Sequence, residues 1–128
     1  GTSQGDCPFI SDAELASALG VSDLTPLIGP STSSPEGLVD CGAFRDNGMY
    51  IQITLWKGSQ KTGFDSLWES GKASPAFEPL PGIGDEAGFG ITGDEANGGA
   101  VVGSIGITVA IDGPLNDIDV GKAMRALL

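Results

Sequence analysis

The strongest constraint on the fold is a pair of strand-like segments, residues 38–44 and 49–56, on either side of Asp46-Asn47-Gly48. Asn-Gly is the pair that best tolerates the positive φ angles of a tight hairpin turn. In the second segment, apolar side chains alternate with polar and aromatic ones, as in a strand with one buried face. The side chains predicted to face the core are those of Met49, Ile51, Ile53 and Leu55, and those predicted to face the opposite side are Tyr50, Gln52, Thr54 and Trp56.

Three other segments have the periodicity of helices. Residues 12–19 follow a capping box, Ser11-Asp12-Ala13-Glu14, and end at Gly20, which supplies a left-handed stop. Residues 62–72 place Phe64, Leu67 and Trp68 at helical spacing, and residues 116–119 cap a third, C-terminal helix with an apolar stripe. These patterns predict one helix before the hairpin, one after it and one at the end of the chain.

Further strands are expected in the second half of the chain. Residues 87–91, 100–104 and 107–112 are predicted strands, and residues 77–80 are a candidate short edge strand. The β-branched side chains that suit a pleated, half-buried surface are Val101, Val102, Ile107, Val109 and Ile111. The polar, glycine-rich residues 92–99 are predicted to be a connector, and Ile105-Gly106 is predicted to be the last tight turn. Residues 21–37 carry prolines at 26, 30 and 35, so a long irregular excursion is expected there.

Together these elements indicate the α+β class. We expect a mainly antiparallel sheet of about five to six strands, in the order α-β-β-α-β-β-β-α, with three helices packed against one face of it. Hairpin-length connections argue against a parallel sheet, which needs a crossover between neighbouring strands. Residues 6–128 are expected to form a single domain, with residues 1–5 as a trimmed tether or an artificial remnant.

The charge and composition exclude several classes of function. The chain has 17 acidic and 6 basic residues and a formal net charge of -11, so phosphate backbones and anionic lipid headgroups would be repelled. Histidine is absent, which removes the usual general base and the commonest zinc ligand. We therefore expect no nucleic-acid binding, no metal site, no cofactor and no enzymatic activity.

The chain has 2 cysteines, Cys7 and Cys41, without the Cys-x-x-Cys spacing of a redox motif. A structural disulfide is the favoured interpretation, and two buried free thiols in a cytosolic protein are the alternative. A bond would close a loop of roughly 34 residues and persist in an extracytoplasmic compartment.

The order of several short motifs resembles a known family. Cys7-Pro8-Phe9-Ile10 precedes the first helix, Cys41-Gly42-Ala43-Phe44 precedes the hairpin turn, and residues 81–87 read Pro-Gly-Ile-Gly-Asp-Glu-Ala. From Cys7 to Leu128 the chain resembles small exported lipoprotein domains of actinobacteria, a family largely of unknown function. More loosely, it is similar to extracytoplasmic sensor domains of bacterial receptor kinases.

That resemblance implies a disulfide between Cys7 and Cys41 and a location in the cell envelope. It also implies a lipid anchor on a cysteine upstream of this chain, so that contact with the membrane would be made through the anchor alone. The implied role is ligand binding or an accessory function, and the resemblance carries no catalytic residues.

The candidate ligand-binding residues are aromatic and polar. Tyr50, Gln52, Trp56 and Trp68 could line a groove, because aromatic rings supply apolar area with a polar handle. The alternative is that these rings cover the sheet beneath a helix, since Trp68 shares its stripe with Phe64 and Leu67. The other features weighed favour structural roles: a turn at residues 82–87, loop serines at 31, 33 and 34, and a solvated acidic rim formed by Asp85, Glu86, Asp94, Glu95 and Asp112.

The leading hypothesis is a non-enzymatic envelope domain. It would bind a small hydrophobic or glycan-type ligand, or an envelope protein, through the sheet face and residues 21–37. The first alternative is an interaction module of an envelope complex without a pocket. The second is an enzyme that acts on a glycan with a pair of carboxylates.

Overall fold

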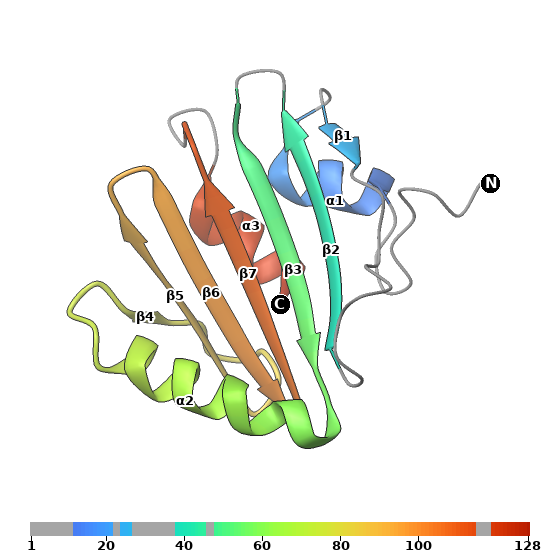
Figure 1. Ribbon diagram of the computed structural model, residues 1–128. Helices are drawn as coiled ribbons and strands as arrows, with labels where there is room; N and C mark the ends of the chain where they lie inside the picture. Colours follow the sequence, from blue (N-terminus) through green and yellow to red (C-terminus); the bar gives the residue numbers. More distant parts are fainter. Residues whose placement is uncertain (1–11, 22–23, 27–37, 46–47, 115–118) are drawn as a thin grey trace.

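Figure 1 shows the computed structural model of the chain, which describes residues 12–21, 24–26, 38–45, 48–114 and 119–128. Seven strands form one sheet in the order β1-β2-β3-β7-β6-β5-β4, and all neighbours are antiparallel. The strands are β1 (Leu24–Pro26), β2 (Leu38–Arg45), β3 (Tyr50–Trp56), β4 (Glu78–Pro79), β5 (Glu86–Thr92), β6 (Glu95–Val102) and β7 (Ile105–Asp112). The predicted α+β class and antiparallel sheet are confirmed.

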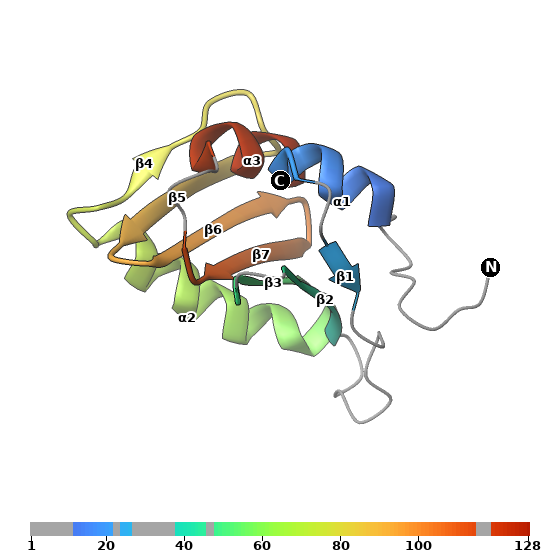
Figure 2. The same ribbon diagram turned by 90° about the horizontal axis from the view of Figure 1, so that it is seen from above.

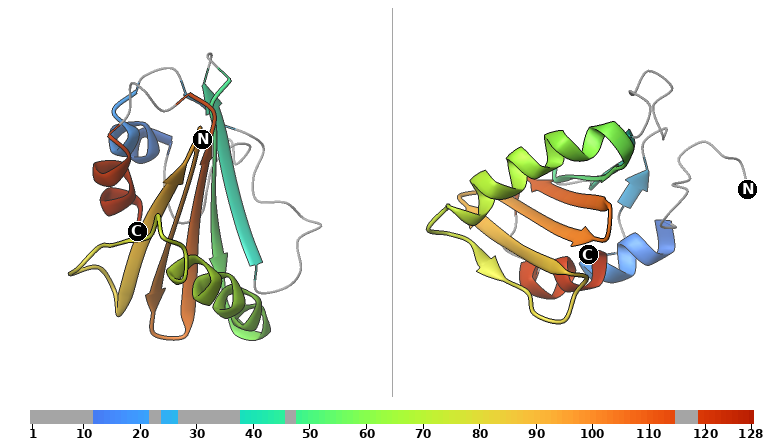
Figure 3. Two further views of the ribbon diagram at one scale, coloured as in Figure 1. Left: turned by 90° about the vertical axis from the view of Figure 1, so that its left-hand side faces the viewer. Right: turned by 90° about the horizontal axis from the view of Figure 1, so that it is seen from below.

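The helices cover both faces of the sheet (Figure 2). α1 (Asp12–Leu19) and α3 (Val120–Leu127) lie side by side on one face, and α2 (Lys61–Lys72) crosses the other. Figure 3 shows the same layers edge-on. The prediction that all three helices pack against one face is therefore wrong for α2.

The reason for the position of α2 lies in β3, which needs cover on both sides. Thr54 and Trp56 point away from the α1–α3 face, yet Thr54 is buried and Trp56 is half-buried. A short 3-10 turn, η1 (Gly58–Gln60), follows β3 and leads directly into α2.

Within the described parts of the chain, no helix combines the length and the apolar content that crossing a bilayer requires.

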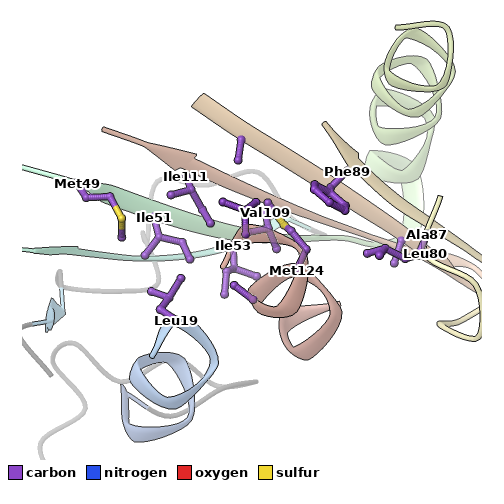
Figure 4. Packing of buried hydrophobic residues seen from close by; sticks show 14 of the residues in the cluster. Leu19, Met49, Ile51, Ile53, Leu80, Ala87, Phe89, Val109, Ile111 and Met124 are labelled. Carbon is purple, nitrogen blue, oxygen red and sulfur yellow. The ribbon is translucent and has the colours of Figure 1, made fainter. Parts of the chain in front are cut away.

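The main core lies between the sheet and the α1–α3 pair (Figure 4). It contains three of the four side chains that the alternation in β3 predicts, since Met49, Ile51 and Ile53 are at most 3% exposed. The fourth, Leu55, is half-buried and is not part of this cluster. β7 adds alternate residues in the same way. The side chains that meet these strands from the helices are Leu19, Val120, Ala123 and Met124.

The predicted ends of the first helix and of the C-terminal helix are confirmed where they are described. Gly20 has a φ of 72°, and its N–H donates to the carbonyl of Ala16 at 2.8 Å. The carboxylate of Asp119 accepts a hydrogen bond from the backbone N–H of Lys122 at 3.1 Å and caps α3. The predicted capping serine, Ser11, lies outside the described residues.

Two strands differ from the prediction. β6 begins at Glu95, so most of the connector predicted over 92–99 is strand, and the turn into β7 is Gly103-Ser104 instead of Ile105-Gly106. Gly103 has a φ of 59°, which suits the first position of a two-residue hairpin turn. β1 lies within the predicted irregular excursion, of which residues 22–23 and 27–37 are outside the described ranges.

The glycines of β6 are explained by helices on both faces. A Cβ atom on Gly98 would lie 2.6 Å from the sulfur of Met124 in α3, and one on Gly99 would lie 2.8 Å from the ring of Trp68 in α2. Glycine in a strand marks such close approaches. The residues that suggested a connector are therefore the ones that let two helices pack on a single strand.

Cys41 occupies a position that suits the predicted disulfide. It is 8% exposed and pairs with Ile53 across β2 and β3, which places its side chain on the face covered by α1. The predicted partner, Cys7, lies a few residues before α1 in the sequence and outside the described residues. The bond remains a prediction.

We expect the intact mass of denatured, unreduced protein to stay unchanged after alkylation, and to rise by two alkyl groups after reduction, one for each of the 2 cysteines. Replacing Cys7 by serine is expected to lower the free energy of unfolding by about 2–5 kcal/mol. Alkylation of both thiols before reduction would show that the bond does not form.

Candidate ligand-binding pocket

A pocket of about 390 Å³ lies between α2 and strands β5, β6 and β7, on the face opposite the main core. Its volume falls in the range of pockets that hold small organic ligands, about 300–1,000 Å³. The wall is formed by α2 and by the segment that follows it, and the floor by the three strands. The wall residues are Phe64, Leu67, Trp68, Gly71, Ser74, Ala76 and Phe77.

The floor is low because the strands present small residues on this face. The cross-strand partners Gly88, Gly99 and Thr108 form one row, and the partners Gly90, Asn97 and Ala110 form the next. All six line the pocket, and none of the described lining residues carries a charged side chain. The pocket is therefore an apolar slot with a few neutral hydrogen-bonding groups.

A row of aromatic rings crosses this layer from β3 to the segment after α2. The ring centroids are 6.5 Å apart from Trp56 to Phe64, 6.0 Å from Phe64 to Trp68 and 5.8 Å from Trp68 to Phe77. Aromatic pairs attract one another at centroid distances of about 4.5–7 Å. Because Phe64 and Trp68 are 0% and 8% exposed, this row forms a well-packed wall for the pocket.

The indole of Trp68 is held in place by a charged pair. Its Nε1–H donates to Oε1 of Glu86 at 3.1 Å, and Nζ of Lys72 donates to the same oxygen at 3.2 Å. Lys72 also pairs with Glu69 at 3.1 Å. The hydrogen bonds from Trp68 and Lys72 lower the pKa of Glu86, and those from Lys72 to Glu69 and Glu86 raise the pKa of Lys72.

The pH dependence of Trp68 follows from these directions. The contribution of Glu86 is complete above the ordinary carboxyl pKa of 4.5 and is lost as the pH falls through its lowered value. The contribution of Lys72 is complete below 10.5 and is lost as the pH rises through its raised value. In a Trp56→Phe variant, in which Trp68 is the sole tryptophan, we expect constant emission in the neutral range and, on acidification, a shift that begins below pH 4.5.

The control is Glu86→Gln in the same background, which keeps an oxygen acceptor for the indole but does not titrate. The acid shift in emission should then disappear. A shift centred above pH 4.5, or one that survives the substitution, would contradict a role for Glu86 in holding Trp68.

The structure brings together two of the four candidate residues. Trp68 lines the pocket, and Trp56 connects to it through Phe64 but does not line it. The indole of Trp56 donates to the hydroxyl of Thr108 at 3.0 Å, so its polar group is satisfied inside the protein. The alternative interpretation, rings covering the sheet beneath a helix, describes Trp56 and also the buried ring of Trp68, which lies on Gly99.

Tyr50 and Gln52 lie on the same sheet face as the pocket, and Gln52 is the cross-strand partner of Ala110 in its floor. Both are half-buried, and neither lines it. Tyr50 is at the opposite end of β3 from Trp56, and a strand rises about 3.3 Å per residue, so these two side chains are roughly 20 Å apart. Tyr50 and Trp56 therefore do not line one groove.

The five acidic residues of the predicted rim are divided between two ends of the β5–β6 hairpin. Asp85 and Glu86 precede or begin β5, whereas Asp94 and Glu95 are at the opposite turn, where Glu95 pairs with Asp112. Asp85 accepts a hydrogen bond from the backbone N–H of Gly103 at 2.8 Å and thereby joins two loops. In the described part of the chain, no group of three or more potential ligands is placed to hold a metal ion.

The floor of the pocket and the position of Phe77 in its wall were not predicted from the sequence. Gly88 and Gly90 are spaced by two in a strand, and this spacing could have indicated one face without side chains. Gly99, the cross-strand partner of Gly88 in β6, was not expected on this face because residues 92–99 were predicted to be a connector. No sequence pattern indicates that Phe77 lies in the wall of the pocket, because a turn after α2 brings it to the sheet.

Comparisons with known proteins assign no function to this geometry. The chain was compared with models of protein families, with curated protein sequences and with solved structures. None of the three comparisons finds a match.

Proposed function

We propose that this chain is a non-enzymatic binding domain that holds a small, uncharged, apolar ligand in the pocket between α2 and strands β5–β7. The observation that carries the proposal is the lining: aromatic and aliphatic side chains form the wall, and glycine and alanine form most of the floor. Pockets for small molecules combine mainly apolar surface with a few polar groups that fix orientation. Here those groups are the side chains of Ser74, Thr92, Asn97 and Thr108.

The lining favours an apolar ligand over a glycan. A sugar ring presents several hydroxyl groups, and each buried hydroxyl without a partner costs about 1–3 kcal/mol. Leu67, Phe64, Trp68 and Phe77 offer almost no partners for such groups. Binding without catalysis is expected because the chain contains no histidine to act as a general base.

An extracytoplasmic setting belongs to the same proposal. It rests on the resemblance to exported lipoproteins and on the expected disulfide, and it includes a lipid anchor upstream of this chain. The protein would then bind its ligand in the cell envelope. Native mass spectrometry of the protein recovered from its host would show a bound small molecule or, if it is an interaction module instead, a partner protein.

The pocket can be tested directly with two uncharged probes, 1-octanol and 2-naphthol. We expect either probe, when bound, to shift the backbone amide NMR signals of Gly90, Asn97 and Ala110, which line the pocket, while those of the α1–α3 layer stay in place. Shifts confined to other surfaces, or no shifts with either probe, would contradict the proposal.

A charge at the mouth of the pocket provides a matched comparison. Leu67 lines the pocket with 54% of its surface exposed, and Ser66 is exposed on the same helix without lining it. Leu67→Asp is expected to weaken probe binding by about tenfold, since a carboxylate beside an apolar ligand loses hydration. Ser66→Asp adds the same charge and should leave the affinity unchanged.

A further inference from the structure

The pocket continues a packing pattern in which aromatic rings lie directly on glycines of the sheet. A Cβ atom built on Gly106 would lie 2.3 Å from Phe64, one on Gly99 would lie 2.8 Å from Trp68, and one on Gly88 would lie 2.3 Å from Phe77. Real Cβ atoms do not approach rings so closely, so each ring rests on bare backbone. The sheet face under α2 is shaped to receive flat rings.

In the next row of the floor, the described atoms nearest to the glycine belong to Ala76 and not to a ring. Gly90, Asn97 and Ala110 form this row, and the three lie directly beside the row that contains Gly88 and Gly99. The atoms nearest to a Cβ built on Gly90 would be the carbonyl oxygen of Ala76 at 3.3 Å and its Cβ at 3.6 Å, so Ala76 borders the pocket at this glycine. The pocket occupies this place, within reach of Trp68 and Phe77.

The neighbouring rings define what would fit there. Trp68 has a parallel partner on one side, Phe64 at an interplanar angle of 13°, and an edge partner, Phe77, at 77°. A planar ring of a ligand can adopt either arrangement at the same centroid spacing. A puckered or branched molecule of equal size would meet the same walls with fewer atoms in contact.

Charge selects against anions at this place. All polar side chains of the described lining are neutral. The next row of the same sheet face carries two carboxylates, those of the cross-strand partners Glu95 and Asp112. With a net charge of -11 for the whole chain, an anionic ligand would be repelled over a long range as well. Asn97, which projects from the floor, can donate to or accept from one polar group of a ligand.

We propose that the ligand of this pocket is an uncharged planar aromatic molecule with one hydrogen-bonding substituent, which adds one more ring to the row formed by Phe64, Trp68 and Phe77. This inference rests on the proposed function, since it names the ligand class of the same pocket. Its distinguishing requirement is flatness: the ligand must lie between a floor of small residues, Gly90 and Ala110, and the aromatic wall.

The experiment compares 2-naphthol with decahydro-2-naphthol, which has the same carbon skeleton and hydroxyl group but puckered, saturated rings. Both are uncharged at neutral pH, and their affinities can be measured by titration followed by NMR. We expect 2-naphthol to bind roughly five- to tenfold more tightly, because stacking on Trp68 and Phe77 adds to its apolar burial. We also expect nuclear Overhauser contacts between its ring protons and the Hα protons of Gly90.

A raised floor should remove the preference. Ala110→Val adds two methyl groups on the floor in a residue type that suits strands, and Ala73→Val makes the same change at an exposed residue just after α2 that does not line the pocket. We expect the first variant to lose most of the advantage of 2-naphthol and the second to keep it. The comparison in the unmodified protein stands by itself if Ala110→Val does not fold.

The outcomes separate the two proposals. Equal or tighter binding of decahydro-2-naphthol, or pocket shifts with 1-octanol but not with 2-naphthol, overturns the planar ligand and leaves the binding pocket intact. Pocket shifts with none of the three probes overturn both. A five- to tenfold preference for 2-naphthol that Ala110→Val abolishes supports both.

Discussion

Replacement of Phe64 by alanine is expected to lower the free energy of unfolding by about 3–5 kcal/mol, because it removes a large buried ring and leaves a cavity. Phe64 is 0% exposed and lies between Trp56 and Trp68 in the aromatic row, with its ring on the backbone of Gly106. No side chain at Gly106 can move in to fill the space. The loss can be measured by urea denaturation followed by circular dichroism.

Leu67→Ala in the same helix is the control. Leu67 is 54% exposed, so its truncation removes little buried surface and should cost about 1 kcal/mol or less. The two variants thereby compare a residue that holds α2 on the sheet with one that faces the mouth of the pocket. Similar losses for both would show that the α2 layer is not packed as described.

Alanine at Gly106 is expected to destabilise the protein by about 1–3 kcal/mol through overpacking. Its Cβ would lie 2.3–2.6 Å from three atoms at the base of the Phe64 ring, which cannot swing away as the end of a flexible side chain could. Trp56 and Trp68 flank that ring and restrict its movement. The helix as a whole would have to shift.

A double variant tests this cause. Phe64→Leu provides space over Gly106, so the effects of Gly106→Ala and Phe64→Leu should be non-additive by about 0.5–3 kcal/mol. Gly71→Ala, in a helix and with no atom within 4 Å of its new Cβ, should instead stabilise the protein by about 0.5–1 kcal/mol. Additive losses in the double variant would exclude the ring as the source of the strain.

These predictions concern the same layer that forms the pocket. Phe64 and Gly106 keep α2 close to the sheet at one end, and Trp68, fixed by Glu86, continues the wall to the pocket. A loosened α2 is therefore expected to weaken binding of 2-naphthol together with stability. The Glu86→Gln variant distinguishes an effect on binding from an effect on stability. It changes the hydrogen bond that positions Trp68, and it does so at an exposed carboxylate and not in the packed layer.

The parts of the fold that follow from local patterns could be predicted from the sequence. The alternation from Met49 to Trp56 identifies β3 and its core face, and the left-handed stop at Gly20 ends α1, because both depend on residues close together in the chain. The acidic composition and the absence of histidine also follow directly from the sequence, and they narrowed the classes of function that we expected. Trp68, one of the candidate residues, lines the pocket, and its role in binding stays a prediction.

The tertiary structure alone decided where α2 lies and what the glycines of β5, β6 and β7 are for. A helix period shows which side of α2 is apolar but not which face of a sheet it will cover, and both faces of β3 accept cover. Gly98 and Gly99 suggest a connector until Met124 and Trp68 are placed on either side of them. The pocket arises from such contacts between residues distant in sequence, and no spacing within one segment encodes it.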